Sequence, residues 1–357
     1  MQRHYFCLGN NFGVISLKVL FIGGTGNISY EVSKLAIEKG IDLYLFNRNN
    51  KSEFFPEGAK LIKGDIRDEA SAKEILKNHE FDVVVNWIAY ETGHVETDIR
   101  LFKGKTGQYI FISTASAYHK PAENYLITER TPLDNPFWDY SSKKIDCEKV
   151  LLEEYRKTGF PVTIVRPSHT YGVTSIPSAF NSPKNKWSIA ERMRRGKKII
   201  VPGDGTSLWV ITHSSDFAKA FVGLLGKSQA IGEDYHITSD EVLNWNLITN
   251  YVGEALGIKP EIIHMSTDFI TTCLPEYYGG LYGDKMESVC FDNSKIKKLV
   301  PDFRATKPAK EGIKESVEWF LKHPEMLWMD EEWDEKCDKL IASHEAGINY
   351  FRSLSNK

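Results

Sequence analysis

The sequence predicts an α/β protein in which a doubly wound parallel sheet is followed by a smaller α/β lobe. Between Lys18 and about Ser168, short apolar runs alternate with segments whose apolar residues recur at helical spacing. Such alternation is typical of parallel strands joined by helices that cover both faces of the sheet. After about Thr170 the strict alternation ends, and proline, aromatic and charged residues become more frequent.

The expected elements of the first half follow one another in regular order. Strands are expected at Lys18–Ile22, Asp42–Phe46, Ala59–Lys63, Asp82–Ile88, Gln108–Ser113 and Val162–Arg166. Helices are expected at about Ile28–Lys39, Glu69–His79, Val95–Phe102 and Tyr140–Lys157. In a sheet of this kind ligands bind at the carboxyl ends of the strands, so the loops after the strands should contain the site.

Composition and charge narrow the class of protein. The 357 residues are 41% hydrophobic and 26% charged, as in a soluble globular protein with a sizeable core. A net charge of -3 gives no electrostatic reason to expect a nucleic acid or a membrane surface as partner. The five scattered cysteines form no C-x-x-C pair and the ten histidines show no ligand spacing. We therefore expect a cytoplasmic protein with reduced thiols and no metal site.

A glycine turn connects the first strand to the first helix. Gly23, Gly26 and Ser29 form the pattern Gly-x-x-Gly-x-x-Ser. This order leaves backbone N–H groups and the positive end of the helix dipole where a phosphate can sit. The pattern is typical of a dinucleotide-binding turn in which Ser29 replaces the third glycine. An ordinary strand-to-helix connection is the alternative interpretation.

The loops after the second and third strands bear on the choice of cofactor. Asn47 and Arg48 stand where NAD-binding folds usually place a carboxylate for the adenosine ribose. Because an arginine can accommodate a 2′-phosphate, the pair is compatible with NADP as well as NAD, or with a plain surface turn. Asp65 could accept a hydrogen bond from the adenine amino group, or it could cap the following helix.

A tyrosine and a lysine at the start of the last expected helix suggest proton transfer. Tyr140 and Lys144 are four residues apart, so they share one face of the helix. A neighbouring ammonium group should lower the pKa of the phenol from its reference value of about 10 and make Tyr140 a general base. The Thr114 hydroxyl, just after the fifth strand, should hydrogen-bond the substrate oxygen. A tyrosine and a lysine at this spacing are common by chance. The pair is a stronger indication here because it follows a dinucleotide-type glycine turn and a strand with Ser113 and Thr114 at its end.

Together these motifs resemble the extended short-chain dehydrogenase/reductase superfamily, and within it the NAD-dependent epimerase/dehydratase family. The resemblance rests on Gly23-x-x-Gly26, Gly64-Asp65, Asn86-Trp87-Ile88-Ala89, Ser113-Thr114, Tyr140-x-x-x-Lys144, Arg166 to Gly172, Gly203-Asp204-Gly205-Thr206 with His213 and Asp216, Phe291 to Lys295 and Gly312–Leu321. The short stretch between Asn86 and Tyr109 also resembles the branch of the chloroplast stem-loop-binding proteins.

The resemblance implies a domain layout and a set of contacts. It implies a Rossmann-type NAD(P)-binding domain over 18–170 and a partly interleaved substrate-binding lobe over 171–322. Residues implied to contact NAD or NADP are Gly23, Gly26, Asn27, Ile28, Asn47, Arg48, Asp65, Ile66, Trp87, Ala89, Ser113, Tyr140, Lys144, Pro167 and His169. Residues implied to contact the substrate are Tyr90, Thr114, Ser116, His169, Trp187 and Trp209. For the aromatic and histidine residues among them, ordinary core packing is the alternative.

The two ends of the chain are expected to lie outside this pattern. Glycine and asparagine interrupt the apolar run of residues 1–17, which is too short for the core of a signal peptide. These residues are expected to be a loose N-terminal extension or the result of a start codon placed too early. Residues 323–357 should form a C-terminal helical extension with no chemistry of its own. The residues expected to pack that helix on the body are Trp328, Trp333, Leu340 and Ile341.

Departures from the family pattern limit the chemistry. Ala115 and Ser116 stand where 4,6-dehydratases carry an acid–base pair, so dehydration by that route is not expected. Trp209 replaces an arginine that usually clasps a pyrophosphate, and none lies between Tyr277 and Lys295. These changes weaken the expectation of a nucleotide-diphosphate sugar. The basic run from Arg192 to Lys198 could compensate, or could be a solvated helix face.

We therefore expect an NAD(P)-dependent epimerase or oxidoreductase that acts on a sugar or sugar nucleotide by hydride transfer. A reductase or dehydrogenase with net redox turnover is the nearest alternative. The stem-loop-binding branch adds an RNA-associated protein with a residual dinucleotide site, which the charge does not favour. No membrane partner is expected, and a homodimer is compatible with the resemblance.

Overall fold

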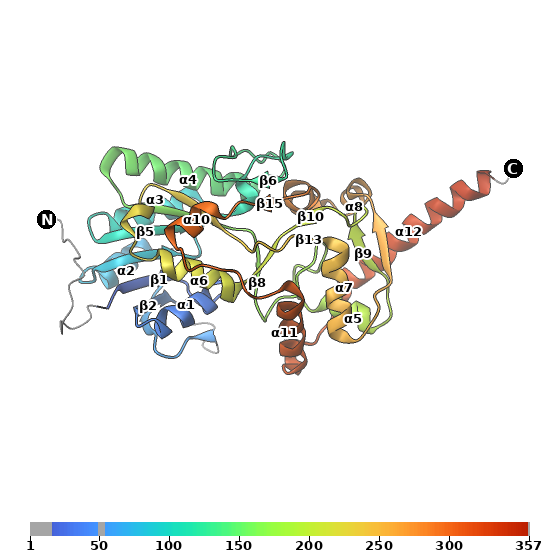
Figure 1. Cartoon of the computed structure of the whole chain (residues 1–357), viewed down its shortest axis with the longest axis horizontal. Helices are drawn as coiled ribbons and strands as arrows, with labels where there is room; N and C mark the ends of the chain where they lie inside the picture. Colours follow the sequence, from blue (N-terminus) through green and yellow to red (C-terminus); the bar gives the residue numbers. More distant parts are fainter. Residues whose placement is uncertain (1–15, 49–53, 356–357) are drawn as a thin grey trace.

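The computed structural model describes residues 16–48 and 54–355, so most of the predicted N-terminal extension lies outside the described residues. One sheet of seven parallel strands, in the order β12–β7–β5–β4–β1–β2–β3, organises the larger lobe. Figure 1 shows this lobe on the left, with β1, β2 and β5 labelled. Its strands are β1 (Lys18–Ile22), β2 (Asp42–Asn47), β3 (Lys60–Lys63), β4 (Phe81–Asn86), β5 (Thr106–Ile112), β7 (Val162–Pro167) and β12 (Asp234–Ile237). The predicted doubly wound α/β sheet is confirmed. The strand order turns back between β1 and β4, where such sheets bind ligands.

Helices cover both faces of the sheet, because successive strand residues point in opposite directions. Val19 and Phe21 of β1 pack with one group of helices, and Leu20 and Ile22 pack with the other. The first group is α1 (Ser29–Glu38), α6 (Ser214–Leu224) and α10 (Ser294–Leu299), and the second is α2 (Glu69–Leu76), α3 (Thr92–Phe102) and α4 (Asp139–Thr158). Burial on both sides explains why the central strands are apolar along their whole length.

A buried ion-pair network fixes α4 against the sheet. The Arg166 guanidinium on β7 donates to both oxygens of Glu148 on α4, at 2.9 and 2.6 Å. It also pairs with Asp234 on β12 at 2.5 Å. The same Glu148 carboxylate accepts a hydrogen bond from the Ser113 hydroxyl at the end of β5. Because these partners come from three neighbouring strands, the network sets the rotation of α4, and with it the direction of Tyr140.

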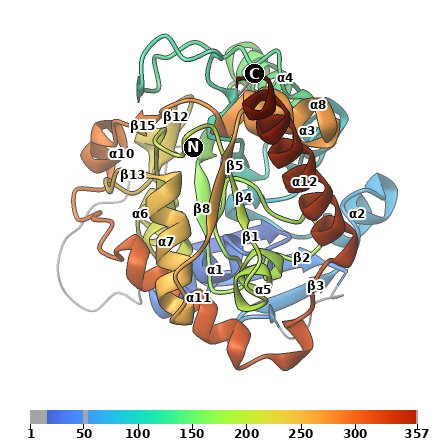
Figure 2. The same cartoon turned by 90° about the vertical axis from the view of Figure 1, so that its right-hand side faces the viewer.

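A smaller α/β lobe, interleaved with the first along the chain, is built mostly from residues after Pro167. Its short strands pair as β8 (His169–Tyr171) with β11 (Ile211–His213), β9 (Ile199–Pro202) with β14 (Ile262–Met265), β10 (Leu208–Trp209) with β13 (Leu243–Asn244), and β6 (Leu126–Ile127) with β15 (Cys290–Phe291). Its helices are α5 (Ser188–Arg194), α7 (Trp245–Leu256), α8 (Thr267–Cys273), α9 (Tyr278–Gly280), α11 (Ala309–Leu321) and α12 (Glu331–Ser355). Figure 2 views the molecule from this side. The lobe has its own apolar core around Trp187, Trp209 and Trp245.

The basic run from Arg192 to Lys198 anchors the C-terminal helix, which neither sequence-based interpretation anticipated. The Arg192 side chain is buried, and its guanidinium pairs with Asp334 and, at 2.9 Å, with Asp338 on α12. Lys197 pairs with the same two carboxylates at 2.5 and 2.7 Å. Arg192 and Lys197 are therefore engaged by α12, whereas Arg194 and Arg195 are exposed, as the solvated-face interpretation predicts. The run joins α5 to the helix that extends beyond the body in Figure 1.

The packing of α12 agrees in part with the prediction. Trp333, Leu340 and Ile341 are buried against the second lobe as expected. Trp328 lies before the helix begins and is 44% exposed, so its predicted packing role is wrong. None of the helices in the described part of the chain combines the length and apolar character needed to cross a membrane.

Candidate active site

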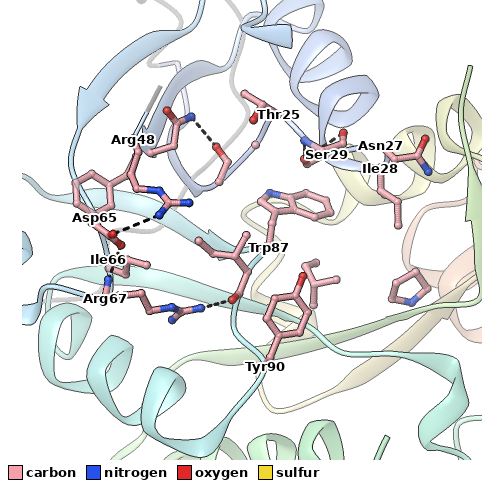
Figure 3. A pocket seen from close by; sticks show the side chains of 18 of the residues that line it. Thr25, Asn27, Ile28, Ser29, Arg48, Asp65, Ile66, Arg67, Trp87 and Tyr90 are labelled. Atoms are coloured by element: carbon pink, nitrogen blue, oxygen red, sulfur yellow. Dashed lines mark hydrogen bonds and ion pairs between the residues drawn. The ribbon is translucent and has the colours of Figure 1, made fainter. Parts of the chain in front are cut away.

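A cavity of about 770 Å³ lies at the carboxyl ends of the strands, where the strand order turns back; we call it the first cavity. The loops after β1, β2, β3 and β4 and the start of α4 form its walls. Figure 3 shows Arg48, Asp65, Trp87 and Tyr90 around it. All but two of the predicted cofactor contacts line this cavity, namely Gly23, Gly26, Asn27, Ile28, Asn47, Arg48, Asp65, Ile66, Trp87, Ser113, Tyr140, Lys144 and Pro167.

The glycine turn has a backbone that side chains would disturb. Gly23 and Gly24 have φ values of +98° and +93°, in the left-handed region that L-residues rarely adopt. A Cβ on Gly24 would also lie 2.6 Å from the Leu45 side chain. Ser29, at the position of the third glycine, is buried, and its hydroxyl accepts a hydrogen bond from the Gly26 N–H at 2.8 Å. The glycines therefore permit the backbone conformation of the turn, and the Ser29 hydroxyl stabilises it by a hydrogen bond from within.

Asn47 and Arg48, at the end of β2, have different roles. The Asn47 side chain donates to the Gly23 carbonyl at 3.1 Å, so it braces the glycine turn. The Arg48 side chain is 67% exposed, and its guanidinium lies 3.8 Å from the Asp65 carboxylate. An exposed pair of this kind contributes little stability, so a ligand phosphate can compete with Asp65 for the guanidinium.

The loop after β3 contains two aspartates, Asp65 and Asp68, and only one of them caps a helix. The Asp65 carboxylate accepts from the Arg67 N–H at 2.9 Å and closes a local turn. Asp68, and not Asp65, is the N-cap of α2, where it accepts from the Ser71 N–H at 3.1 Å. Asp65 thus lines the first cavity without a helix-capping role.

Tyr140 and Lys144 point from one face of α4 toward the end of the sheet. Lys144 is buried, and its ammonium group donates to the carbonyl oxygens of Ala89 and Ile112, both at 2.7 Å. Burial lowers the pKa of Lys144 to about 8. The ammonium nitrogen lies 4.5 Å from the centroid of the Tyr90 ring and 5.8 Å from that of Tyr140.

The predicted lowering of the Tyr140 pKa is wrong for this arrangement. Burial, reinforced by Tyr90, raises the pKa of Tyr140 to about 12, and interaction with the Thr114 side chain opposes this only in part. The reason is that the ammonium group of Lys144 faces two backbone carbonyls rather than the phenol oxygen. The predicted cofactor contact of Ala89 is also wrong, because Ala89 is buried and does not line the cavity. Its carbonyl oxygen instead accepts a hydrogen bond from Lys144.

A second cavity of about 490 Å³ adjoins the first between the two lobes. Tyr140 and Pro167 line both cavities, so they mark the junction. Of the predicted substrate contacts, Thr114, Ser116 and His169 line the second cavity. The Ser116 hydroxyl hydrogen-bonds to that of Thr114 at 2.9 Å.

His169 and Tyr90 are each placed differently from the prediction. His169 lines only the second cavity, although it was expected to contact the cofactor as well. Its Nδ1 is buried and has no hydrogen-bond partner among the described residues. Burial, and next the charge of Lys285, lower the pKa of His169 to about 3, so the ring is neutral. Tyr90, expected at the substrate, lines the first cavity instead.

The two tryptophans predicted to contact the substrate belong to the core of the second lobe. Trp187 is fully buried against Phe320, with ring centroids 5.3 Å apart, and its indole N–H donates to Glu191 at 3.2 Å. Trp209 is buried against Trp245, with centroids 4.9 Å apart. Neither lines a cavity. The substrate role is therefore corrected to core packing, because large aromatic surfaces are most stable when buried.

Sequence reasoning missed several residues of the second cavity. Lys186, Asp284 and Lys285 line it, together with Asn181. They come from two segments about a hundred residues apart, before α5 and around α9. No periodicity or motif links these segments, and only their folding against the first lobe brings them together.

A protein-family model and several known proteins match most of this chain. The family model described as NAD dependent epimerase/dehydratase family matches residues 19–102 and 100–238. The chain is 27% identical over 261 residues to the chloroplast stem-loop binding protein of 41 kDa b from Arabidopsis thaliana, covering 69% of this chain and 65% of that protein. It is 23% identical over 339 residues to the human dTDP-D-glucose 4,6-dehydratase, covering 87% and 92%.

Solved structures share the fold across most of the chain. The dTDP-glucose 4,6-dehydratase of Bacillus anthracis, solved in complex with NAD, superposes with a TM-score of 0.69 at 22% identity, covering 88% of this chain and 99% of that one. The UDP-glucose 4-epimerase of Thermotoga maritima, solved with UDP-glucose, has a TM-score of 0.68 at 21% identity, covering 86% and 99%. Since the family match extends over more than half of its length, the chain belongs to the NAD-dependent epimerase/dehydratase family.

Proposed function

We propose that this protein is an NAD(P)-dependent epimerase, or a related short-chain oxidoreductase, that acts on a sugar or sugar nucleotide. The observation that carries the proposal is the position of Tyr140, whose side chain lines both cavities. A phenol at this junction can exchange a proton with a substrate in the second cavity. Thr114, which lines that cavity as well, can hydrogen-bond the same substrate oxygen.

The first cavity fits a dinucleotide in its backbone as well as in its size. The glycines at positive φ let the backbone form the tight turn that lines this cavity, and the N-terminus of α1 offers N–H groups to a phosphate. Asp65 would accept from the adenine amino group, and Lys144 would hold the nicotinamide ribose. When bound, the cofactor supplies the hydride acceptor and donor of the reaction. The exposed Arg48 guanidinium supports NADP as an alternative to NAD.

The chain's own residues must overcome the high pKa of the phenol. With a pKa of about 12, ionising Tyr140 at pH 7 costs about 7 kcal/mol. A positive charge close to the phenol oxygen would reduce that cost. Lys144 is the nearby cation, and we propose that during the cycle its ammonium group leaves one of its two carbonyl partners to approach the phenol.

Replacing Tyr140 by phenylalanine tests this assignment. The Tyr140→Phe variant should lose turnover of sugar nucleotides and free sugars by at least about a hundredfold, because proton transfer is removed. Its NAD(P) affinity, measured by fluorescence titration, should change little. Tyr125→Phe is the control, since Tyr125 is 59% exposed and lines neither cavity. Full activity of Tyr140→Phe would refute the proposed proton transfer.

Two further functions deserve a direct test. Net redox turnover would use the same site, and it is favoured if the purified protein releases its nicotinamide readily instead of holding it through repeated cycles.

RNA association is suggested by the similarity to the Arabidopsis chloroplast stem-loop binding protein. A filter-binding titration at moderate salt should give tight binding if that function applies, and no retention of RNA would remove it.

A further inference from the structure

We propose that Lys186 and Lys285 bind a single anionic group of the substrate, a phosphate or a carboxylate, in the second cavity. This inference rests on the proposed function, because it specifies the substrate class of the same site. It assigns the enzyme to sugars that carry one anionic group rather than to nucleotide-diphosphate sugars.

The second cavity contains one more positive charge than negative charge. Its two lysines come from different segments, Lys186 just before α5 and Lys285 just after α9, and its one carboxylate belongs to Asp284. Lys285 is already compensated, because its ammonium group lies 2.9 Å from the Asp284 carboxylate. The Lys186 ammonium group donates only to the Ser182 carbonyl oxygen, at 3.0 Å, and no carboxylate pairs with it in the described ranges 16–48 and 54–355.

The neighbouring Lys184 differs from Lys186 in having a carboxylate partner. Lys184, two residues earlier, points outside the cavity and pairs with Glu332 on α12 at 2.6 Å. Lys186 instead lines the cavity and is exposed to solvent. Burial among the cavity walls, and next the charge of Lys285, lower the pKa of Lys186. Because Lys186 and Lys285 line the same cavity, an anion bound there would be attracted by both ammonium groups.

A neutral hydrogen-bonding group completes the site. His169 lines the same cavity, and its buried Nδ1 has no partner in the described part of the chain. A buried polar atom without a partner is costly unless a ligand or water satisfies it. The second cavity is therefore lined by a lysine cation and by a neutral histidine ring.

The type of cation argues for one anionic group. None of the residues that line the second cavity is an arginine. An arginine fork is the geometry that clasps a diphosphate through paired hydrogen bonds, whereas a lysine is a compact point charge. The position where the family resemblance placed such an arginine holds Trp209, which is buried in the core. The site therefore suits the single phosphate of a sugar phosphate or the carboxylate of a sugar acid.

Calorimetric titration of the full-length protein, with and without added NAD, tests the inference. The probes are glucose 1-phosphate, glucuronate, glucose and UDP-glucose. An anionic sugar should bind at least about tenfold more tightly than glucose, and Lys186→Gln should weaken its binding about tenfold while leaving glucose unaffected. Lys186→Arg should restore most of the affinity, and Lys184→Gln should change nothing. The tighter of the two anionic probes identifies phosphate or carboxylate as the group recognised.

Several results would overturn the inference. These are the absence of binding by either anionic sugar, equal binding to the wild type and Lys186→Gln, and binding of UDP-glucose more than about tenfold tighter than that of glucose 1-phosphate. Because binding is measured without turnover, the proposed function can fail separately. Lys186-dependent anion binding without any turnover would refute the enzymatic proposal alone, and turnover insensitive to Lys186→Gln would refute this inference alone.

Discussion

Replacing Asp98 by asparagine should remove a pH-dependent loss of stability that the wild type suffers above pH 4. Asp98 on α3 is fully buried, and one carboxylate oxygen accepts from the Tyr109 hydroxyl and the Asn86 amide. Its other oxygen, Oδ1, has no partner within the described residues. Burial therefore raises the pKa of Asp98 from 3.8 to about 6, and the hydrogen bonds from Tyr109 and Asn86 oppose this only in part.

The sign of the effect follows from proton binding. Between pH 3.8 and 6 the folded protein binds more protons at Asp98 than the unfolded chain does, so its stability falls as the pH rises. The complete loss, for a pKa difference of 2.2, is about 3 kcal/mol, and about 2 kcal/mol of it falls between pH 4.5 and 7.5. Asparagine at this position can still accept both hydrogen bonds and has no charge to bury.

Urea unfolding of the wild type and Asp98→Asn at several pH values between 4.5 and 7.5 measures this effect. Because all other titrating groups are shared, the difference between the two unfolding free energies isolates Asp98. That difference should move in favour of the variant by about 2 kcal/mol as the pH rises. A difference that stays constant across the range, or moves toward the wild type, would refute the argument that burial controls this carboxylate.

Two further predictions concern the second lobe. Arg192→Met should destabilise the protein by about 3 kcal/mol and make α12 easier to cleave by protease, because the buried Asp334 loses a partner. The control is Arg194→Met, which removes an exposed pair with Glu191 and should cost under about 0.5 kcal/mol. Trp187→Ala should cost about 3 to 5 kcal/mol in urea unfolding, as expected for a core residue, while the exposed Trp328→Ala changes little; equal effects of the two would contradict the corrected assignment of Trp187.

The first lobe could be predicted from the sequence because its signals are local. The strand β1, the glycine turn and α1 occupy one continuous stretch, and each strand end determines where its loop lies. For that reason most of the predicted cofactor contacts line one cavity. The protonation of Tyr140 was not accessible in the same way. Sequence spacing places Lys144 on the same helix face, but only coordinates reveal that the Ala89 and Ile112 carbonyls hold its ammonium group.

The second lobe could be predicted only in outline, because its contacts join distant segments. The basic run around Arg192 had two sequence-based interpretations, and its true partners, Asp334 and Asp338, lie more than a hundred residues later. Trp187 and Trp209 illustrate the same limit. An aromatic residue at a motif position can face a ligand or the core, and the difference depends on neighbours such as Phe320 and Trp245.

The loss of an arginine at one position does not mean that the site has lost its attraction for anions. Trp209 stands where the family resemblance implies that arginine, and it is buried in the core of the second lobe beside Trp245. The uncompensated positive charge appears instead at Lys186, on a different segment that reaches the same cavity. Anion recognition depends on where charge lies in the folded cavity, and several chain segments can supply it. A search limited to motif positions would therefore assign this cavity no cation, whereas its geometry provides one.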